Sequence, residues 1–240
     1  MLYHSNNISL SDQGKFRIYF HLPGFSIPGH TDHGYGPLAT VAESFMDPDT
    51  WVKLHQHKNE EIISWVPEGV MRHNDKTVGE LITDKDHLMI MNAGSGFWHE
   101  ERTLATDPPL RMLQIFVRPY ALDLSPGIQH KPLAPGRNNE WRNIFGPVGS
   151  DFYVRNDIQM HDIRLDKGTT TQFPAKPGYD TFFLVYTGAI KVKDQLFRMR
   201  GNGLIVDETG VLLEAVEDTL LVAFSINPKA VITKEGTIGR

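Results

Sequence analysis

The chain has 240 residues and a mass of 27.2 kDa, which suits one large β domain or two domains of about 120 residues each. Hydrophobic residues make up 40% of the chain, charged residues make up 22%, and the net charge is −5. These values exclude a disordered or fibrous protein and a strongly basic surface for nucleic acid. Because the chain has no cysteine, disulfide bonds and iron–sulfur clusters are excluded, and any metal must bind nitrogen and oxygen.

Short apolar segments bounded by Gly, Pro, Asp or Asn recur along the chain and predict β-strands. They cover residues 38–45, 61–66, 88–92, 111–117, 158–165, 181–186, 204–207 and 219–226. Helical periodicity is weak, and the best helical candidate is a short turn at residues 139–145. The sequence therefore predicts an all-β fold.

The chain lacks a segment that would direct it to a membrane. Its longest strongly apolar run, residues 219–226, is far too short to span a bilayer. The N-terminus also lacks the basic segment followed by an apolar stretch that a secretory signal needs. We therefore expect no membrane association and a cytoplasmic location.

A proline- and glycine-rich stretch divides the chain into two strand-rich halves. It predicts an N-terminal domain over residues 1–125, a linker over 126–140 and a C-terminal domain over 141–240. In the first half Glu61 is followed eight residues later by Gly69, and in the second Asp180 is followed eight later by Gly188. This repeat predicts duplicated β-barrels, with chance similarity as the alternative.

Two pairs of metal-ligand side chains occur in the first half. His55 and His57 are two residues apart, as are His99 and Glu101. On a strand, residues at this spacing project from the same face, so each pair points into one cavity. Three imidazoles and one carboxylate suit Fe(II), Mn, Ni, Cu or Zn and leave positions open for substrate or dioxygen. The alternative reading is two polar residues on an exposed strand face.

The ligand pairs lie within longer motifs. HQHKNEEIISWVPEG, then RHND and MNAGSGFWHEE, resemble the cupin motifs as the pirin family carries them. The resemblance implies a bicupin, two stacked jelly-roll barrels, with one divalent metal, most often iron, bound by His55, His57, His99 and Glu101. Glu61 would then lie behind the ligands or be unused, whereas His73 and Asp75 could hydrogen-bond into the site or form a structural pair.

The sequence departs from the family pattern outside the ligand set. Gln56 stands where a proline is usual between the two histidines, and Asp49 and Thr50 stand where a glycine is expected. These differences bear on pocket shape and substrate more than on metal binding. In the second half, the repeat puts Pro174, Lys176, Leu213 and Ala215 at the ligand positions, so we expect that barrel to bind no metal.

The resemblance implies an Fe(II)-dependent dioxygenase of the quercetin 2,3-dioxygenase type. Its substrates would be dioxygen and a flat, flavonol-like phenol, with Glu101 as the catalytic base. A second hypothesis is a non-catalytic regulator whose iron redox state controls binding of a protein partner without direct contact to nucleic acid. A cupin isomerase acting on a sugar or keto acid is a weaker third hypothesis.

Overall fold

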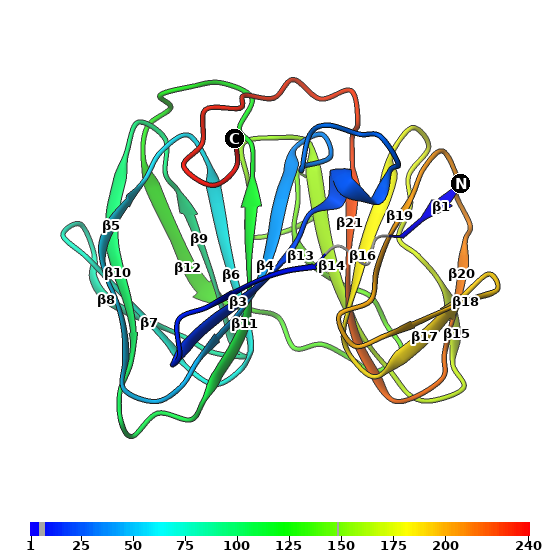
Figure 1. Cartoon of the computed structure of the whole chain (residues 1–240), viewed down its shortest axis with the longest axis horizontal. Coiled ribbons are helices and arrows are strands. Elements are labelled where there is room, and N and C mark those ends of the chain that lie inside the picture. The colour runs from blue at the N-terminus through cyan, green and yellow to red at the C-terminus, as the bar shows by residue number, and fades with distance from the viewer. Residues whose placement is uncertain (5–7, 148) are drawn as a thin grey trace.

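The computed structural model describes residues 1–4, 8–147 and 149–240, and over these residues the chain folds into two β-barrels that lie side by side (Figure 1). Each barrel consists of one large and one four-stranded sheet, and neighbouring strands pair antiparallel. This confirms the predicted all-β bicupin architecture. Within the described residues, no helix is long and apolar enough to cross a membrane.

The first barrel combines a seven-stranded sheet with a four-stranded one in the described part of the chain. The large sheet has the order β12-β9-β6-β11-β4-β3-β2. Its strands are β2 (Ile8–Asp12), β3 (Phe16–His21), β4 (Leu38–Met46), β6 (Glu61–Glu68), β9 (His87–Asn92), β11 (Leu110–Val117) and β12 (Gly127–Pro132). The small sheet contains β5 (Thr50–His57), β10 (Phe97–Thr103), β7 (Met71–Asp75) and β8 (Gly79–Thr83), in that order. A 3₁₀ turn, η1 (Pro23–Ser26), precedes β4.

The second barrel repeats this plan with shorter strands. Over the described residues its large sheet has the order β1-β19-β16-β21-β14-β13, and its small sheet has the order β15-β20-β17-β18. The large sheet contains β1 (Leu2–Tyr3), β13 (Arg142–Phe145), β14 (Ile158–Leu165), β16 (Asp180–Thr187), β19 (Asn202–Ile205) and β21 (Thr219–Ile226). The small sheet contains β15 (Thr170–Gln172), β17 (Ala189–Val192), β18 (Gln195–Arg198) and β20 (Leu212–Ala215).

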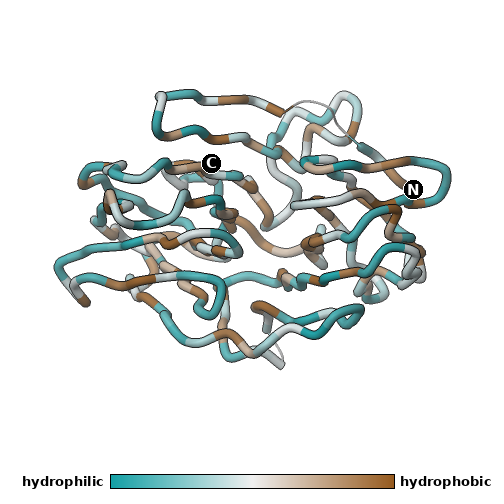
Figure 2. The backbone as a smooth tube through the Cα atoms, turned by 90° about the horizontal axis from the view of Figure 1, so that it is seen from below, coloured by the Kyte–Doolittle hydropathy of each residue, from teal (hydrophilic) through white to brown (hydrophobic). Residues whose placement is uncertain are grey.

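The two large sheets pack face to face, and their facing side chains form one hydrophobic core. Ile63 and Trp65 of β6 pack in the same cluster as Phe182 and Leu184 of β16. The intervening side chains on β6, such as Ile62, point into the first barrel instead. Because both faces of these strands are buried, their sequences are nearly continuous apolar runs, whereas the connecting loops are mostly hydrophilic (Figure 2).

The predicted repeat is visible in two matching turns. Gly69 and Gly188 follow β6 and β16 and adopt φ values of 87° and 81°. A Cβ atom on Gly69 would lie 2.5 Å from the carbonyl oxygen of Pro109, and one on Gly188 would lie 2.2 Å from that of Asp218. Both turns therefore need a residue without a side chain.

The chain crosses between the barrels more often than the predicted domain boundaries imply. β1 precedes the first barrel in sequence but pairs with β19 of the second. β12 lies inside the predicted linker, residues 126–140, yet pairs with β9 of the first barrel. The division at residues 125 and 141 stays a prediction.

The helical turn predicted at residues 139–145 is wrong. β13 occupies its second half and pairs with β14. Ile144 and Phe145 are buried in the core between the barrels, and Arg142 donates two hydrogen bonds to Asp162 on β14. Burial and cross-strand pairing outweigh a weak local helical preference here.

Candidate metal centre

The candidate site lies inside the first barrel on two neighbouring strands, β5 and β10. They pair with His99 opposite His55 and Phe97 opposite His57. Along β10, His99 and Glu101 are buried, whereas the intervening Glu100 side chain faces outward and accepts a hydrogen bond from Trp51. The two pairs of candidate ligands therefore face the interior, as the strand periodicity predicts.

The pairing register between these strands shifts between His99 and Glu101, which pair with His55 and Val52. One residue on β10 thus faces two residues on β5, Lys53 and Leu54, and this arrangement is a β-bulge. Because of the bulge, Val52 and His55 point to the same side although they are three residues apart. The bulge directs the imidazole of His55 into the barrel.

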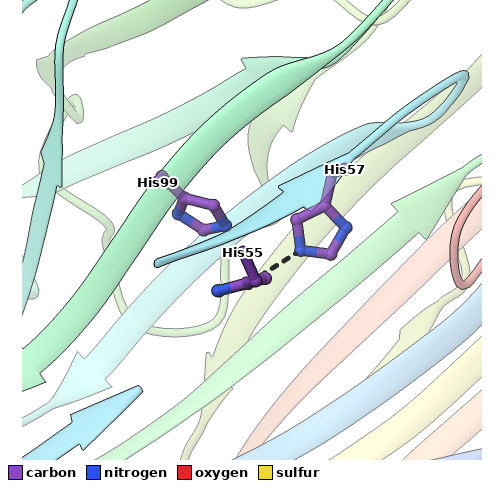
Figure 3. Close-up of side chains that lie close together, drawn as sticks. All are labelled: His55, His57 and His99. Carbon is purple, nitrogen blue, oxygen red and sulfur yellow. Dashed lines mark hydrogen bonds between the residues drawn. The ribbon is translucent and has the colours of Figure 1, made fainter. Parts of the chain in front are cut away.

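The three histidines form a compact group. The candidate ligand nitrogens of His55, His57 and His99 all lie within 4.8 Å of one another, and the three rings point toward a common centre (Figure 3). The Nε2 atoms of His55 and His57 are 3.1 Å apart. His99 is fully buried, and its Nε2 atom has no hydrogen-bond partner within the described residues.

Hydrogen bonds at the far side of each ring fix its tautomer. The Nδ1–H of His55 donates to the carbonyl oxygen of Lys53 at 2.8 Å, and the Nδ1–H of His57 donates to Oε1 of Glu60 at 2.5 Å. With its proton on Nδ1, each ring presents an Nε2 lone pair to the centre. Two lone pairs 3.1 Å apart, beside an unpartnered buried nitrogen, repel one another unless a cation lies among them. The residues present thus fit a metal ion.

A third neighbouring strand, β7, completes a hydrogen-bond chain behind His99. His73 Nε2–H donates to Oδ2 of Asp75 at 2.5 Å, and its Nδ1 lies 3.2 Å from Nδ1 of His99. Because Nε2 of neutral His73 carries the proton, its Nδ1 accepts one from His99. His73 and Asp75, whose role the sequence left open, thus lie behind the candidate ligand His99.

Burial keeps these imidazoles neutral. Desolvation is the main cause that lowers the pKa of His55, His73 and His99, and the neighbouring histidines lower the pKa of His99 further. A neutral imidazole is the form that binds a metal.

Glu101 lies beside the three histidines but outside their compact group. Its Oε1 atom is 3.8 Å from Nδ1 of His99 and accepts a hydrogen bond from Nε2 of Gln114 at 2.9 Å. The side chain is buried, and this burial raises its pKa to about 7, although His57 and Gln114 lower it. A carboxyl group in this position can exchange a proton with a group bound beside the histidines.

Glu61 lies away from the candidate ligands. Its carboxylate accepts hydrogen bonds from the side chain of Arg155, which follows β13 in the chain, and from Nδ2 of Asn92. Asp180, its counterpart in the repeat, accepts a hydrogen bond at 2.6 Å from the hydroxyl group of Tyr35 in the first half. Of the two roles expected for Glu61, the structure places it outside the metal site and not behind the ligands. Both acids instead link the two halves of the chain.

Glu60 and Gln114 contact the site but were not singled out from the sequence. Glu60 follows β5 in a three-residue loop, where strand periodicity no longer predicts the direction of a side chain. Asn59 in this loop has a φ of 54°, and this turn directs Glu60 back toward His57. The one sequence signal is that Glu60 and Glu61 form an acidic pair where β6 begins, which hints that the two residues have different roles.

In the second barrel, the positions equivalent to the candidate ligands carry side chains with structural contacts. Leu213 and Ala215 are buried in its hydrophobic core. The ammonium group of Lys176 lies 4.5 Å from the centre of the Tyr179 ring.

Comparison with known proteins supports the resemblance seen in the sequence. Residues 27–117 match the sequence model of the Pirin family. A "Pirin-like protein" from Caulobacter vibrioides is 24% identical over 216 residues, which cover 88% of this chain and 93% of that protein. A "Quercetin 2,3-dioxygenase" from Escherichia coli O157:H7 is 20% identical over 197 residues, which cover 81% of this chain and 84% of that protein.

Solved structures share the fold. The crystal structure of YhhW from Escherichia coli superposes with a TM-score of 0.83 at 18% identity, covering 94% of this chain and 97% of that one. The same bacterial pirin in complex with nickel(II) gives a TM-score of 0.81 at 19% identity, covering 94% of this chain and 98% of that one.

Proposed function

Because residues 27–117 match the Pirin family model and the relatives include pirin-like proteins, we propose that this protein is a metal-dependent dioxygenase of the quercetin 2,3-dioxygenase type that acts in the cytoplasm. The convergence of three imidazoles, of which His57 and His99 are buried and His55 is half-buried, supports this proposal most strongly. The names of the relatives supply the reaction type.

In this proposal His55, His57 and His99 hold one divalent metal, with Glu101 as the fourth ligand. Fe(II) suits the reaction, although Mn, Ni, Cu or Zn can bind the same nitrogen and oxygen donors. When bound, the ion would supply a Lewis acid for the substrate hydroxyl group and a site for dioxygen. Glu101 also serves as the base, because its buried carboxylate lies on the same face of β10 as His99.

The chain supplies an apolar surface for a flat phenol near the histidines. The ring of Phe116 lies 6.0 Å from that of His57, and the ring of Phe97 lies 6.1 Å from that of His73. Both phenylalanines are buried in the first barrel. In the proposed reaction they pack against the aromatic substrate and exclude water, while Glu101 accepts the proton of the substrate hydroxyl group.

The test measures metal content and oxygen uptake on the same preparations. We expect the iron-loaded protein to bind one metal ion and to consume oxygen with quercetin or a related flavonol. His57→Ala should lose both properties, whereas His4→Ala, a change at an exposed histidine outside the first barrel's ligand strands, should keep them. Metal binding without oxygen uptake would refute the enzyme and favour a regulator that binds a protein partner.

A further inference from the structure

A segment that follows the second barrel reaches the candidate metal centre of the first. After β21 the chain crosses back over the top of the molecule, and its last residues lie beside the first barrel (Figure 1, red). The backbone N–H of Thr237 donates to the carbonyl oxygen of Lys58, and the N–H of Lys58 donates to Oγ1 of Thr237 at 2.9 Å. The segment is therefore hydrogen-bonded to the loop that follows His57.

Glu60 connects this segment to a candidate ligand. The Glu60 carboxylate is fully buried, and its Oε1 atom accepts the hydrogen bond from His57 Nδ1. Its Oε2 atom accepts hydrogen bonds from the backbone N–H groups of Ile238 and Gly239, at 2.8 and 2.9 Å. A buried carboxylate is costly unless donors surround it, so these two amide groups stabilise Glu60 in the position where it holds His57.

The segment fits Glu60 closely. Gly236 and Gly239 are both buried, and a Cβ atom on Gly236 would lie 2.9 Å from Oε2 of Glu60. On the other side, the Nε–H of Arg118 donates to the carbonyl oxygen of Gly239 at 2.9 Å, and Arg118 is 1% exposed. The amide groups are thus held against the carboxylate from both sides.

We propose that residues 236–239 are a positioning element of the metal centre and act on His57 through Glu60. By binding Oε2, the two amide groups keep Oε1 at Nδ1 of His57, which leaves the Nε2 lone pair directed at the metal. The proposal rests on the metal site described above. It extends that site to a segment that comes after the second barrel in the chain.

The experiment compares Co(II) affinity, measured by competition with a chelator, in the full-length protein and its variants. Glu60→Gln should weaken Co(II) binding by about 10- to 100-fold. A glutamine has one carbonyl oxygen, so it cannot accept hydrogen bonds from both the imidazole and the amide groups. If its oxygen faces the amides, its NH₂ group faces Nδ1 of His57 and forces the proton onto Nε2.

Gly236→Ala displaces the segment without changing any side chain of the site, and we expect it to weaken Co(II) binding by about tenfold. Its matched control is Gly136→Ala, at an exposed glycine where a Cβ atom would approach Arg142 Nε only to 3.5 Å. In the Gly236→Ala protein, Glu60→Gln should cost less affinity than in the parent, because the amide groups no longer compete for the oxygen. The ligand-field absorption of bound Co(II) should change in both variants and stay unchanged in the control.

These readouts separate the possible failures. If the parent protein binds no Co(II), the metal site itself is wrong. If the parent binds Co(II) and Gly236→Ala binds it with the same affinity and spectrum, the positioning role of the segment is refuted. Equal losses from Glu60→Gln in both backgrounds would also refute it, because Glu60 and the segment would then act independently.

Discussion

The ion pair between Glu61 and Arg155 offers a direct test of how the two barrels are held together. The Glu61 carboxylate is fully buried and accepts hydrogen bonds from Arg155 Nε and Nη2 at 2.9 and 2.6 Å. The Arg155 side chain is 13% exposed and also donates to the carbonyl oxygen of Ser125. The two partners therefore differ in their access to water.

This difference predicts unequal effects of removing either partner. Arg155→Met leaves a buried carboxylate without its counter-charge and should lower the free energy of unfolding by about 3 to 5 kcal/mol. Glu61→Gln leaves a guanidinium group that retains a carbonyl partner and some contact with water, so its loss should be about 1 to 3 kcal/mol. In the double variant, the loss should be smaller than the sum of the two single losses.

Urea unfolding followed by tryptophan fluorescence measures these free energies, since Trp65 lies in the core between the barrels. A loss below about 1 kcal/mol for Arg155→Met would refute the reasoning, because removing the guanidinium group from a buried carboxylate costs more than that. Metal affinity provides the second readout. Glu61→Gln should leave the metal affinity unchanged, whereas a substitution at a residue that supports the ligands would lower the metal affinity.

Three further predictions concern the metal site and pH. Asp75→Asn places an NH₂ group against Nε2 of His73, which moves the proton of His73 to Nδ1 and that of His99 to Nε2. Metal affinity should therefore fall about 10- to 100-fold. Asp84→Asn, in the β8–β9 turn, is the control. Removing the metal with a chelator should lower the free energy of unfolding by about 2.7 kcal/mol relative to protein held at about 100 times the dissociation constant, and an unchanged urea midpoint would contradict metal binding to the folded state. Burial lowers the pKa of His21 from 6.5 to about 4, so on acidification the unfolded chain binds this proton before the folded chain does. The free energy of unfolding should therefore fall by about 2 kcal/mol between about pH 7 and pH 5. His21→Asn should abolish this part of the pH dependence of the free energy of unfolding.

Apolar runs predicted the central strands of the two large sheets, whereas the outer strands β1, β2, β3, β12 and β13 were not predicted. β4, β6, β9, β11, β14, β16 and β21 lie where apolar runs predicted them, because these strands are buried on both faces. β19 begins at Asn202, two residues before the predicted start, because Asn202 is buried and hydrogen-bonded to His21. The hairpin strands β7, β8, β17 and β18 were missed, since their outer faces carry polar residues and their apolar runs are short.

The convergence of His55, His57 and His99 was predictable because strand residues two apart share a face, whereas Glu101 as a ligand stays a prediction. The contacts of the two neighbouring carboxylates were less predictable, since they join distant parts of the chain. Glu60, behind His57, meets amide groups from residues 238 and 239, and Glu61, away from the ligands, meets Arg155. A carboxylate's partner across such a separation in sequence depends on how the barrels stack, and local patterns carry no information about that.

Each end of the described chain contacts the barrel that is formed mainly by the other half of the chain. β1 extends the sheet of the second barrel, while residues 237–239 bind to the first. Cutting the chain in the middle therefore does not yield two self-sufficient halves, because each fragment would carry one stretch that belongs to the other. Separately expressed halves should associate when mixed, and an isolated N-terminal fragment would keep every proposed metal ligand yet lack the amide groups that hold Glu60.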